Sequence, residues 1–168
     1  MKYKIKEIEI NAFSFDKVNI DDNKIINLKY HNDSLEFQTP KIIIDSLIKE
    51  NNHEYISLKI IGNKACESFY SKISELEIFF NEKVKIYLNP KLPKHDIKSV
   101  FNEDSFIVKI PFKNSNPLIK VYKDNKLFNY YHLTKGMEII CLLTINKLWI
   151  NYKNETSYNL NVKEILVK

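Results

Sequence analysis

Most of the chain alternates apolar and polar residues in short runs, which is the pattern of half-buried β-strands. In residues 105–112, for example, Phe106, Val108 and Ile110 fall on one face. The alternation predicts strands at residues 3–15, 24–30, 35–39, 42–44, 55–61, 84–88, 105–112, 118–123, 126–131, 137–145, 148–152 and 157–167. Residues 45–54 follow neither period, so the pattern leaves a helical turn and a loop open there.

A single segment, residues 64–82, carries the helical period instead. Steps of mostly three and four residues place these side chains on one helical face: Cys66, Phe69, Tyr70, Ile73, Leu76 and Phe80. One amphipathic helix among many strands favours a small closed or half-closed barrel, with the helix plugging one side of an antiparallel sheet. We therefore expect a mainly β fold with one central amphipathic helix, in a single domain over residues 1–168.

Turn-forming residues separate the predicted strands. Asp124-Asn125 lies between two alternating runs and predicts a two-residue hairpin turn. Asn146-Lys147 predicts a second tight turn in the same way. Pro40 removes a ladder donor, so its strand ends there, lies at an edge or carries a bulge. Residues 89–96 are predicted as a long connection.

The charge balance favours an anionic partner. The 168 residues carry a formal net charge of +5, with a pI of about 9.0, but 21 carboxylates are mixed among 26 cations. All the cations are Lys, and the abundance of Lys, Asn and Ile is typical of an AT-rich genome. Without Arg, the chain lacks the bidentate forks that read guanine in a duplex. Binding at the level of the phosphate backbone is therefore favoured over sequence-specific duplex readout.

The same alternation predicts which side chains face outward, and it places the aromatic residues and Lys residues of four strands on one common outer face. Ammonium groups that neutralise phosphates, beside rings that stack on bases, are typical of single-stranded nucleic-acid binding. The candidate binding residues are Tyr55, Lys59, Lys83, Lys85, Tyr87, Lys120, Tyr122, Lys147, Trp149 and Lys153. The alternative is an ordinary half-solvated strand face in a Lys-rich chain. Trp149, the only Trp, is the sharpest candidate, and its alternative is a partly buried core residue.

No catalytic or metal-binding pattern stands out. The four His residues are scattered, with no pair at metal-ligand spacing. The two Cys residues sit in apolar runs and are expected to be buried. With two glycines in total, a phosphate-cradling loop is not expected. We therefore predict a non-enzymatic protein with no cofactor and no metal.

The apolar runs also bear on location. The first ten residues look like a first strand rather than a signal peptide. The longest apolar stretch, residues 139–143, is far shorter than the roughly 20 residues that a membrane span needs. These patterns favour an intracellular protein with no membrane partner.

Two segments resemble a known family. One is residues 35–44, LEFQTPKIII, and the other runs from Lys135-Gly136 through Leu148-Trp149-Ile150 to the last strand. Their order, with the helix between them, resembles the phage-T7-type single-stranded-DNA-binding proteins of large eukaryotic DNA viruses. The resemblance implies an OB-fold-like antiparallel barrel elaborated with extra strands. It also implies sequence-nonspecific coating of single-stranded DNA in replication, repair or recombination.

Three partner classes follow from this reading: single-stranded DNA, replication proteins and further copies of the chain. A runner-up class is a minor capsid or cementing β-domain of a virus particle with no nucleic-acid role. The 10 Tyr and 10 Phe residues suit that class, because aromatic residues are enriched at protein interfaces. A third functional class, after DNA binding and particle structure, is an accessory subunit of a replication or transcription complex.

Overall fold

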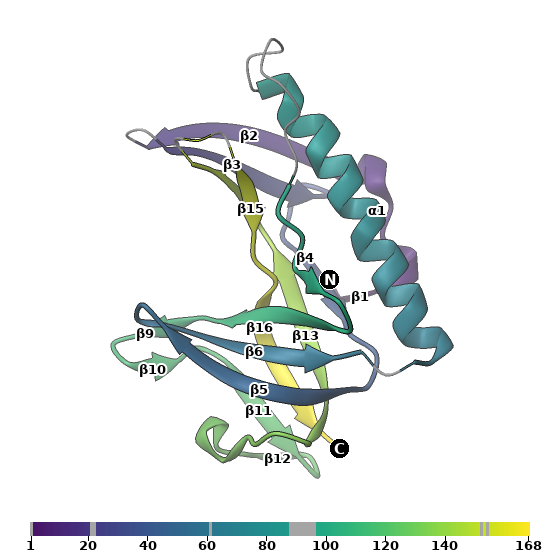
Figure 1. Ribbon diagram of the computed structural model, residues 1–168, viewed down its shortest axis with the longest axis vertical. Coiled ribbons are helices and arrows are strands. Elements are labelled where there is room, and N and C mark those ends of the chain that lie inside the picture. The colour runs from purple at the N-terminus through teal and green to yellow at the C-terminus, as the bar shows by residue number, and fades with distance from the viewer. Residues whose placement is uncertain (1, 21–22, 61, 88–96, 152, 154) are drawn as a thin grey trace.

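The computed structural model describes residues 2–20, 23–60, 62–87, 97–151, 153 and 155–168 (Figure 1). The helices are α1 (Lys64–Tyr87) and the short 3-10 turns η1 (Ile5–Glu7), η2 (Ile10–Ala12) and η3 (Tyr130–His132). The strands are β1 (Lys2–Lys4), β2 (Phe13–Ile20), β3 (Asn23–Tyr30), β4 (Leu35–Gln38), β5 (Ile42–Glu50), β6 (His53–Lys59), β7 (Phe101–Asn102), β8 (Ser105–Ile110), β9 (Phe112–Lys113), β10 (Asn116–Pro117), β11 (Lys120–Lys123), β12 (Lys126–Leu127), β13 (Glu138–Ile145), β14 (Lys147–Ile150), β15 (Thr156–Tyr158) and β16 (Asn161–Val167). The predicted connection over residues 89–96 and the strand end at Leu88 lie outside the described residues.

A closed barrel forms the centre of the fold. Strands β13, β5, β6, β8 and β16 pair in that order, and β16 pairs back to β13. The pairing is antiparallel except between β8 and β16, where Asn161 lies opposite Lys109 in a parallel pair. Register shifts at Asp45 in β5 and at Lys163 in β16 add one residue to each strand. Such bulges bend strands, which helps a five-stranded sheet to close. The mainly β, OB-like barrel with one helix is confirmed.

A second sheet packs beside the barrel, with the strand order β15-β14-β3-β2. The chain crosses to it at Asn146, whose carbonyl accepts a hydrogen bond from the Leu28 amide at 2.8 Å. The predicted tight turn at Asn146-Lys147 is therefore wrong, because β14 pairs with β3 and β15 instead of β13. Strands β4 and β1 extend the barrel sheet beyond β13, and β11 and β12 extend it beyond β16.

Asparagine takes the place of glycine at the hairpin turns. Asn51-Asn52 joins β5 to β6 with φ of 47° and 62°, and Asp124-Asn125 joins β11 to β12 with φ of 51° and 61°. Two successive residues with positive φ form the turn that matches the twist of a hairpin, and Asn and Asp tolerate that conformation best after Gly. The turn at Asp124-Asn125 is confirmed. Residues 45–54, predicted as a helical turn or a loop, are instead the rest of β5, the Asn51-Asn52 turn and the start of β6.

Helix α1 is longer than predicted. The Asn63 side chain caps its start, since Oδ1 accepts hydrogen bonds from the amides of Ala65 and Cys66, both at 3.0 Å. The strand predicted at residues 84–88 is wrong, because the helix continues to Tyr87. Val84 is buried four residues after Phe80, so the helical period outweighs the β-propensity of this stretch.

The core face of α1 contacts both sheets. Near its start, Phe69 packs against Phe106 of β8, with ring centroids 5.2 Å apart. Near its end, Phe80 packs edge-on against Phe13 of β2, with centroids 5.4 Å apart. Of the side chains predicted on this face, Tyr70 alone is exposed, at 44%, and its ring contacts Phe101. Figure 1 shows the helix running along both layers.

The N-terminal segment is less regular than predicted. Residues 3–15 form β1, two 3-10 turns and the start of β2 rather than one strand. Strand β1 pairs in parallel with β4. The Gln38-Thr39-Pro40 motif ends β4: the buried Thr39 hydroxyl accepts a hydrogen bond from the Cys141 amide at 2.9 Å, and Pro40 follows outside the ladder. The motif therefore has a structural role in this fold.

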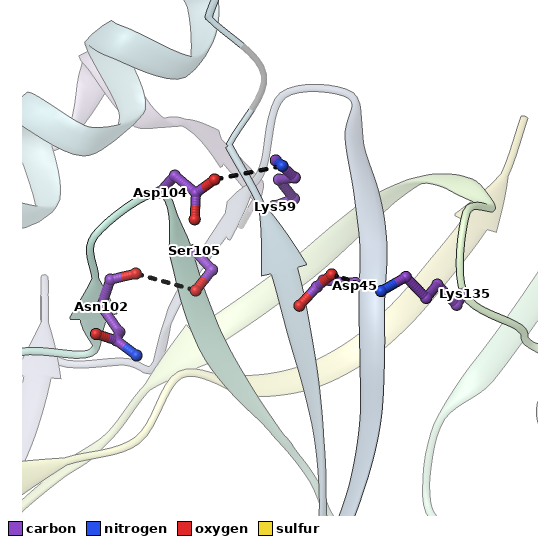
Figure 2. Close-up of polar contacts among 6 residues, drawn as sticks. All are labelled: Asp45, Lys59, Asn102, Asp104, Ser105 and Lys135. Atoms are coloured by element: carbon purple, nitrogen blue, oxygen red, sulfur yellow. Dashed lines mark hydrogen bonds and ion pairs between the residues drawn. The ribbon is translucent and has the colours of Figure 1, made fainter.

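The Lys-Gly turn before β13 is tied to the bulge of β5. The Gly136 amide donates to the Ile44 carbonyl at 2.8 Å. Lys135 Nζ lies 3.2 Å from Asp45 Oδ1 (Figure 2). Gly136 has a φ of 88°, which favours glycine. This turn fixes where β13 meets β5 and so where the barrel closes.

We predict that Phe80→Ala lowers the free energy of unfolding by roughly 3–5 kcal/mol, as expected for a truncated core aromatic. Phe80 is 0% exposed and packs against aromatic rings of β2 and β15. Chemical denaturation followed by circular dichroism measures the change. The control is Ile86→Ala on the same helix, where the side chain is 72% exposed and little change is expected. Equal stability of the two variants would contradict the bridging role of α1.

Candidate nucleic-acid interface

Four side chains form a row across the outer surface of the barrel. Tyr55 of β6 lies opposite Lys109 of β8, Lys109 opposite Asn161 of β16, and Asn161 opposite Thr144 of β13. Because paired residues of neighbouring strands lie on the same face, the row follows from the register alone. At roughly 4.8 Å between strands, it crosses about 14 Å of surface. An aromatic ring, an ammonium group, an amide and a hydroxyl are thereby brought side by side.

A hollow lies where this row meets β14 of the second sheet, and we call it the Trp149 hollow. Its volume is about 620 Å³. It is lined by Asn52, His53, Lys109, Ile110, Pro111, Phe112, Leu118, Thr144, Asn146, Lys147, Trp149, Asn159, Asn161, Val162 and Lys163. Three of these residues are Lys, and no described carboxylate lines the hollow. Its charge therefore suits an anion, and Trp149 and Phe112 supply apolar ring surface.

A second hollow, the Tyr55 hollow, adjoins the first. Its volume is about 360 Å³, and it shares Lys109 and Asn159 with the Trp149 hollow. Its lining is Ile48, Glu50, Tyr55, Lys98, Ser99, Val100, Ile107, Lys109, Ser157, Tyr158 and Asn159. We call these two adjoining hollows the groove: Trp149 lines one of them, Tyr55 lines the other and Lys109 lines both.

Lys109 is the half-buried cation that lines both hollows of the groove. Its ammonium group has no carboxylate partner among the described residues, and burial lowers its pKa. A desolvated and unpaired ammonium gains more from a bound anion than a fully hydrated one does, because the attraction is less screened. Lys163, in contrast, forms an ion pair with Glu36. Lys109 is therefore the strongest anion-binding candidate in the groove.

Tyr55 is a neutral ring with a restricted position. Burial, and then the nearby charge of Glu50, raises the pKa of its phenol. The edge of the His53 ring contacts it, with centroids 6.3 Å apart. A neutral, partly covered phenol ring at the surface can offer its remaining face to a stacked base.

Strand β15 forms one wall of the groove, and helix α1 holds this wall in place. The Tyr158 hydroxyl donates a hydrogen bond to Glu77 Oε1 at 2.6 Å, and the Val100 amide donates to the same oxygen at 3.0 Å. Burial, and then the charge of Glu77, raises the pKa of Tyr158 well above its ordinary value, so the donor proton stays in place. A single carboxylate thus joins the helix to two segments that line the Tyr55 hollow.

The structure brings three of the ten predicted binding residues together in the groove, namely Tyr55, Lys147 and Trp149. Trp149 is half-buried on β14, between the buried Leu148 and Ile150, as its alternation predicts. Lys147 is exposed beside it. The groove residues on the barrel and those on β14 belong to different sheets, so the predicted common strand face is wrong. Packing of two sheets gathers them instead.

The remaining seven predicted residues lie elsewhere. Lys59 forms an ion pair with Asp104, at 3.4 Å (Figure 2). Lys83, Lys85 and Tyr87 belong to α1 rather than to a strand, and Lys83 lies 5.3 Å from the Phe79 ring centroid. The side chain of Tyr87 lies outside the described part of the structure.

The other three predicted residues lie on β11 or after β14. Lys120 and Tyr122 are on β11, where Tyr122 lines a separate shallow hollow with Ile140 and Leu166. Lys153 follows β14 in a turn, where its amide donates to Asn151 Oδ1 at 2.9 Å. None of these three lines the groove.

The sequence-based prediction missed several groove residues: Lys98, Lys109, Phe112, Asn159, Asn161 and Lys163. Alternation could have found Lys109, since it lies between the buried Val108 and Ile110. Lys98 follows a segment with no period. Lys163 owes its position to a bulge, which alternation does not predict.

The described residues offer neither a metal-binding cluster nor a membrane-spanning helix. No group of three or more His, Cys, Asp or Glu side chains there could hold a metal ion. No described helix is both long enough and apolar enough to cross a membrane.

Comparison with known proteins gives a fold relationship. No family model and no curated protein matches the chain. Among solved structures, the chain is similar to gp2.5, a single-stranded DNA binding protein encoded by bacteriophage T7. The TM-score is 0.57 at 12% identity, over 80% of this chain and 86% of that chain. At this identity the likeness shows a T7-type fold. The predicted origin in a large eukaryotic virus stays a prediction.

We predict that Lys109→Met does not lower the melting temperature. Burial lowers the pKa of Lys109, so folding disfavours its charged form. This penalty is fully present at neutral pH and is lost as the pH rises from the lowered pKa to the ordinary value of 10.5. Met keeps an apolar stem of similar length without the charge. Thermal unfolding at pH 7 measures the effect, beside Lys126→Met, which removes an exposed Lys from β12. A melting temperature clearly lower for Lys109→Met than for Lys126→Met would show that the ammonium stabilises the fold.

Proposed function

We propose that this protein binds single-stranded DNA in the groove, without sequence-specific duplex readout. The observation that carries the proposal is that Lys109, half-buried and without a carboxylate partner among the described residues, lines both the hollow of Trp149 and the hollow of Tyr55. Cations that contact phosphates and rings that stack on bases are the two components of single-strand binding. The T7-type fold supports the proposal, because the similar structure is described as a single-stranded DNA binding protein.

The chemistry of the groove favours an unpaired strand over a duplex. Rings stack on bases only where the bases are not already stacked and paired with a second strand. The chain has no Arg, so the usual bidentate contact to guanine in the major groove is not available. Lys side chains contact phosphates as point charges, which gives affinity with little sequence information.

Other parts of the sequence-based prediction stay proposals. A role in replication, repair or recombination, replication proteins as partners, self-association and an intracellular location all accord with single-strand binding. The proposed activity is binding without catalysis. The runner-up, a structural β-domain of a virus particle, needs no salt-sensitive binding of DNA, so the titration below separates the two.

We predict salt-sensitive binding to oligo-dT. Four Lys residues line the groove, namely Lys98, Lys109, Lys147 and Lys163, and we expect Lys163 to exchange Glu36 for a phosphate on binding. Four phosphate contacts give a slope of log K against log salt of about −3 for a single strand. Fluorescence anisotropy of labelled oligo-dT at several salt concentrations measures the slope. Lys109→Met should bring the slope closer to zero by about 0.7, the share of one phosphate.

The matched control is Lys126→Met, which removes the same charge from β12, outside the groove. We expect it to keep the wild-type slope. Equal effects of the two variants would place the phosphate contacts elsewhere. No binding at low salt would favour the structural class.

We predict that Trp149→Ala weakens binding by roughly ten- to a hundredfold with little loss of stability, because stacking on an aromatic ring contributes about 1–3 kcal/mol per base. As the only Trp, it also reports binding directly, since a stacked base should quench its fluorescence. Tyr122→Ala is the control, because Tyr122 lines the separate hollow beside β11. Loss of stability with unchanged affinity for Trp149→Ala would assign Trp149 to the core instead.

A further inference from the structure

The Trp149 hollow holds more hydrogen-bonding groups than phosphate binding needs. Four asparagines line it, namely Asn52, Asn146, Asn159 and Asn161. None of their amides forms a side-chain hydrogen bond with another described residue. Four amides without a side-chain hydrogen bond to another described residue therefore belong to a hollow that Trp149 also lines.

A buried hydroxyl adds to this set. Thr144 is 8% exposed, lines the same hollow and lies opposite Asn161 in the register. Its Oγ1 has no hydrogen-bond partner among the described residues. A buried polar atom without a partner costs free energy, so a ligand or a water that completes its hydrogen bond is favoured.

These groups match the edge of a nucleobase better than they match a phosphate. Phosphate oxygens only accept hydrogen bonds, so they leave the amide oxygens and the Thr144 hydroxyl oxygen without donors. An unpaired base offers both donors and acceptors on its Watson–Crick edge, and single-stranded bases are commonly read there. Trp149, in the same hollow, supplies the ring on which such a base stacks.

We propose that the Trp149 hollow reads the Watson–Crick edge of one stacked base and prefers a pyrimidine. This inference rests on the proposed function. The ammonium groups of Lys109 and Lys147 and the amide N–H groups make the hollow richer in donors than in acceptors, whereas the Lys163 ammonium is paired with Glu36. Thymine and cytosine each present two acceptors and one donor group on that edge. Adenine presents one of each, and guanine presents more donors than acceptors. Binding thus combines backbone affinity with a modest base preference.

The experiment compares two short oligomers of equal length, one of thymidine and one of its difluorotoluene analogue. The analogue keeps the shape and the stacking surface of thymine but lacks its strong hydrogen-bonding groups. Full substitution prevents the protein from shifting to another register along the strand. Each base-edge hydrogen bond is worth about 0.5–1.5 kcal/mol, so wild type should bind the thymidine oligomer about three- to tenfold more tightly.

Two variants of groove residues and one control variant test whether these asparagines contact the base edge. Asn161→Ala and Asn159→Ala should each reduce the affinity ratio between the two oligomers by a similar factor. Asn11→Ala should keep the wild-type ratio, because Asn11 is exposed in η2 and does not line the groove. Replacing thymidine by deoxyadenosine throughout should weaken binding to wild type more than to Asn161→Ala.

The outcomes separate this inference from the proposed function. If both oligomers bind wild type equally well, the base-edge inference is wrong while single-strand binding stands. If Asn161→Ala weakens the binding of both oligomers by the same factor, Asn161 positions the strand and does not read the base. The inference is then also overturned. If neither oligomer binds wild type, the proposed function fails together with it.

Discussion

The groove depends on the aromatic packing of α1 against two separate sheets. Phe69 contacts the barrel through Phe106, and Phe80 contacts the second sheet through Phe13. Trp149 belongs to the second sheet and Lys109 belongs to the barrel, so their separation is set by the helix that both sheets share. The Glu77 carboxylate, which accepts from both Tyr158 and Val100, adds a polar contact to the same bridge. This packing, together with the chain crossing at Asn146, fixes how the two halves of the groove lie relative to each other.

Barrel closure determines the chemistry within each half. The closed order of β5, β6, β8, β16 and β13 brings Tyr55, Lys109 and Asn161 into one row, although they lie far apart in the sequence. The bulge at Lys163 both helps closure and places a further ammonium group at the groove. The turns that allow this closure use Asn and Asp at positive φ, which explains how a chain with two glycines forms so many tight hairpins.

Local patterns predicted the elements well and their assembly poorly. The helix, most strands and the turn at Asp124-Asn125 follow from period and turn chemistry, which act over a few residues. The extent of α1 is mispredicted because Val84, Ile86 and Tyr87 have high β-propensity, whereas burial of Val84 in the core stabilises a helix at this position. Alternation along β14 correctly predicts that Trp149 points away from the buried Leu148 and Ile150. Its neighbour Lys109 comes from another sheet, and no pattern along the chain encodes which strand of one sheet faces the other.

The central claim is that one groove between the barrel and the second sheet holds the single strand. Photo-crosslinking with oligo-dT in which some thymines are replaced by 5-iodouracil, followed by mass spectrometry of the protein, tests it most directly. Adducts are predicted at Trp149 and Tyr55, the rings that line the two hollows of the groove. Adducts at Tyr122 of β11 or on the exposed face of α1, with none at Trp149, would contradict the account.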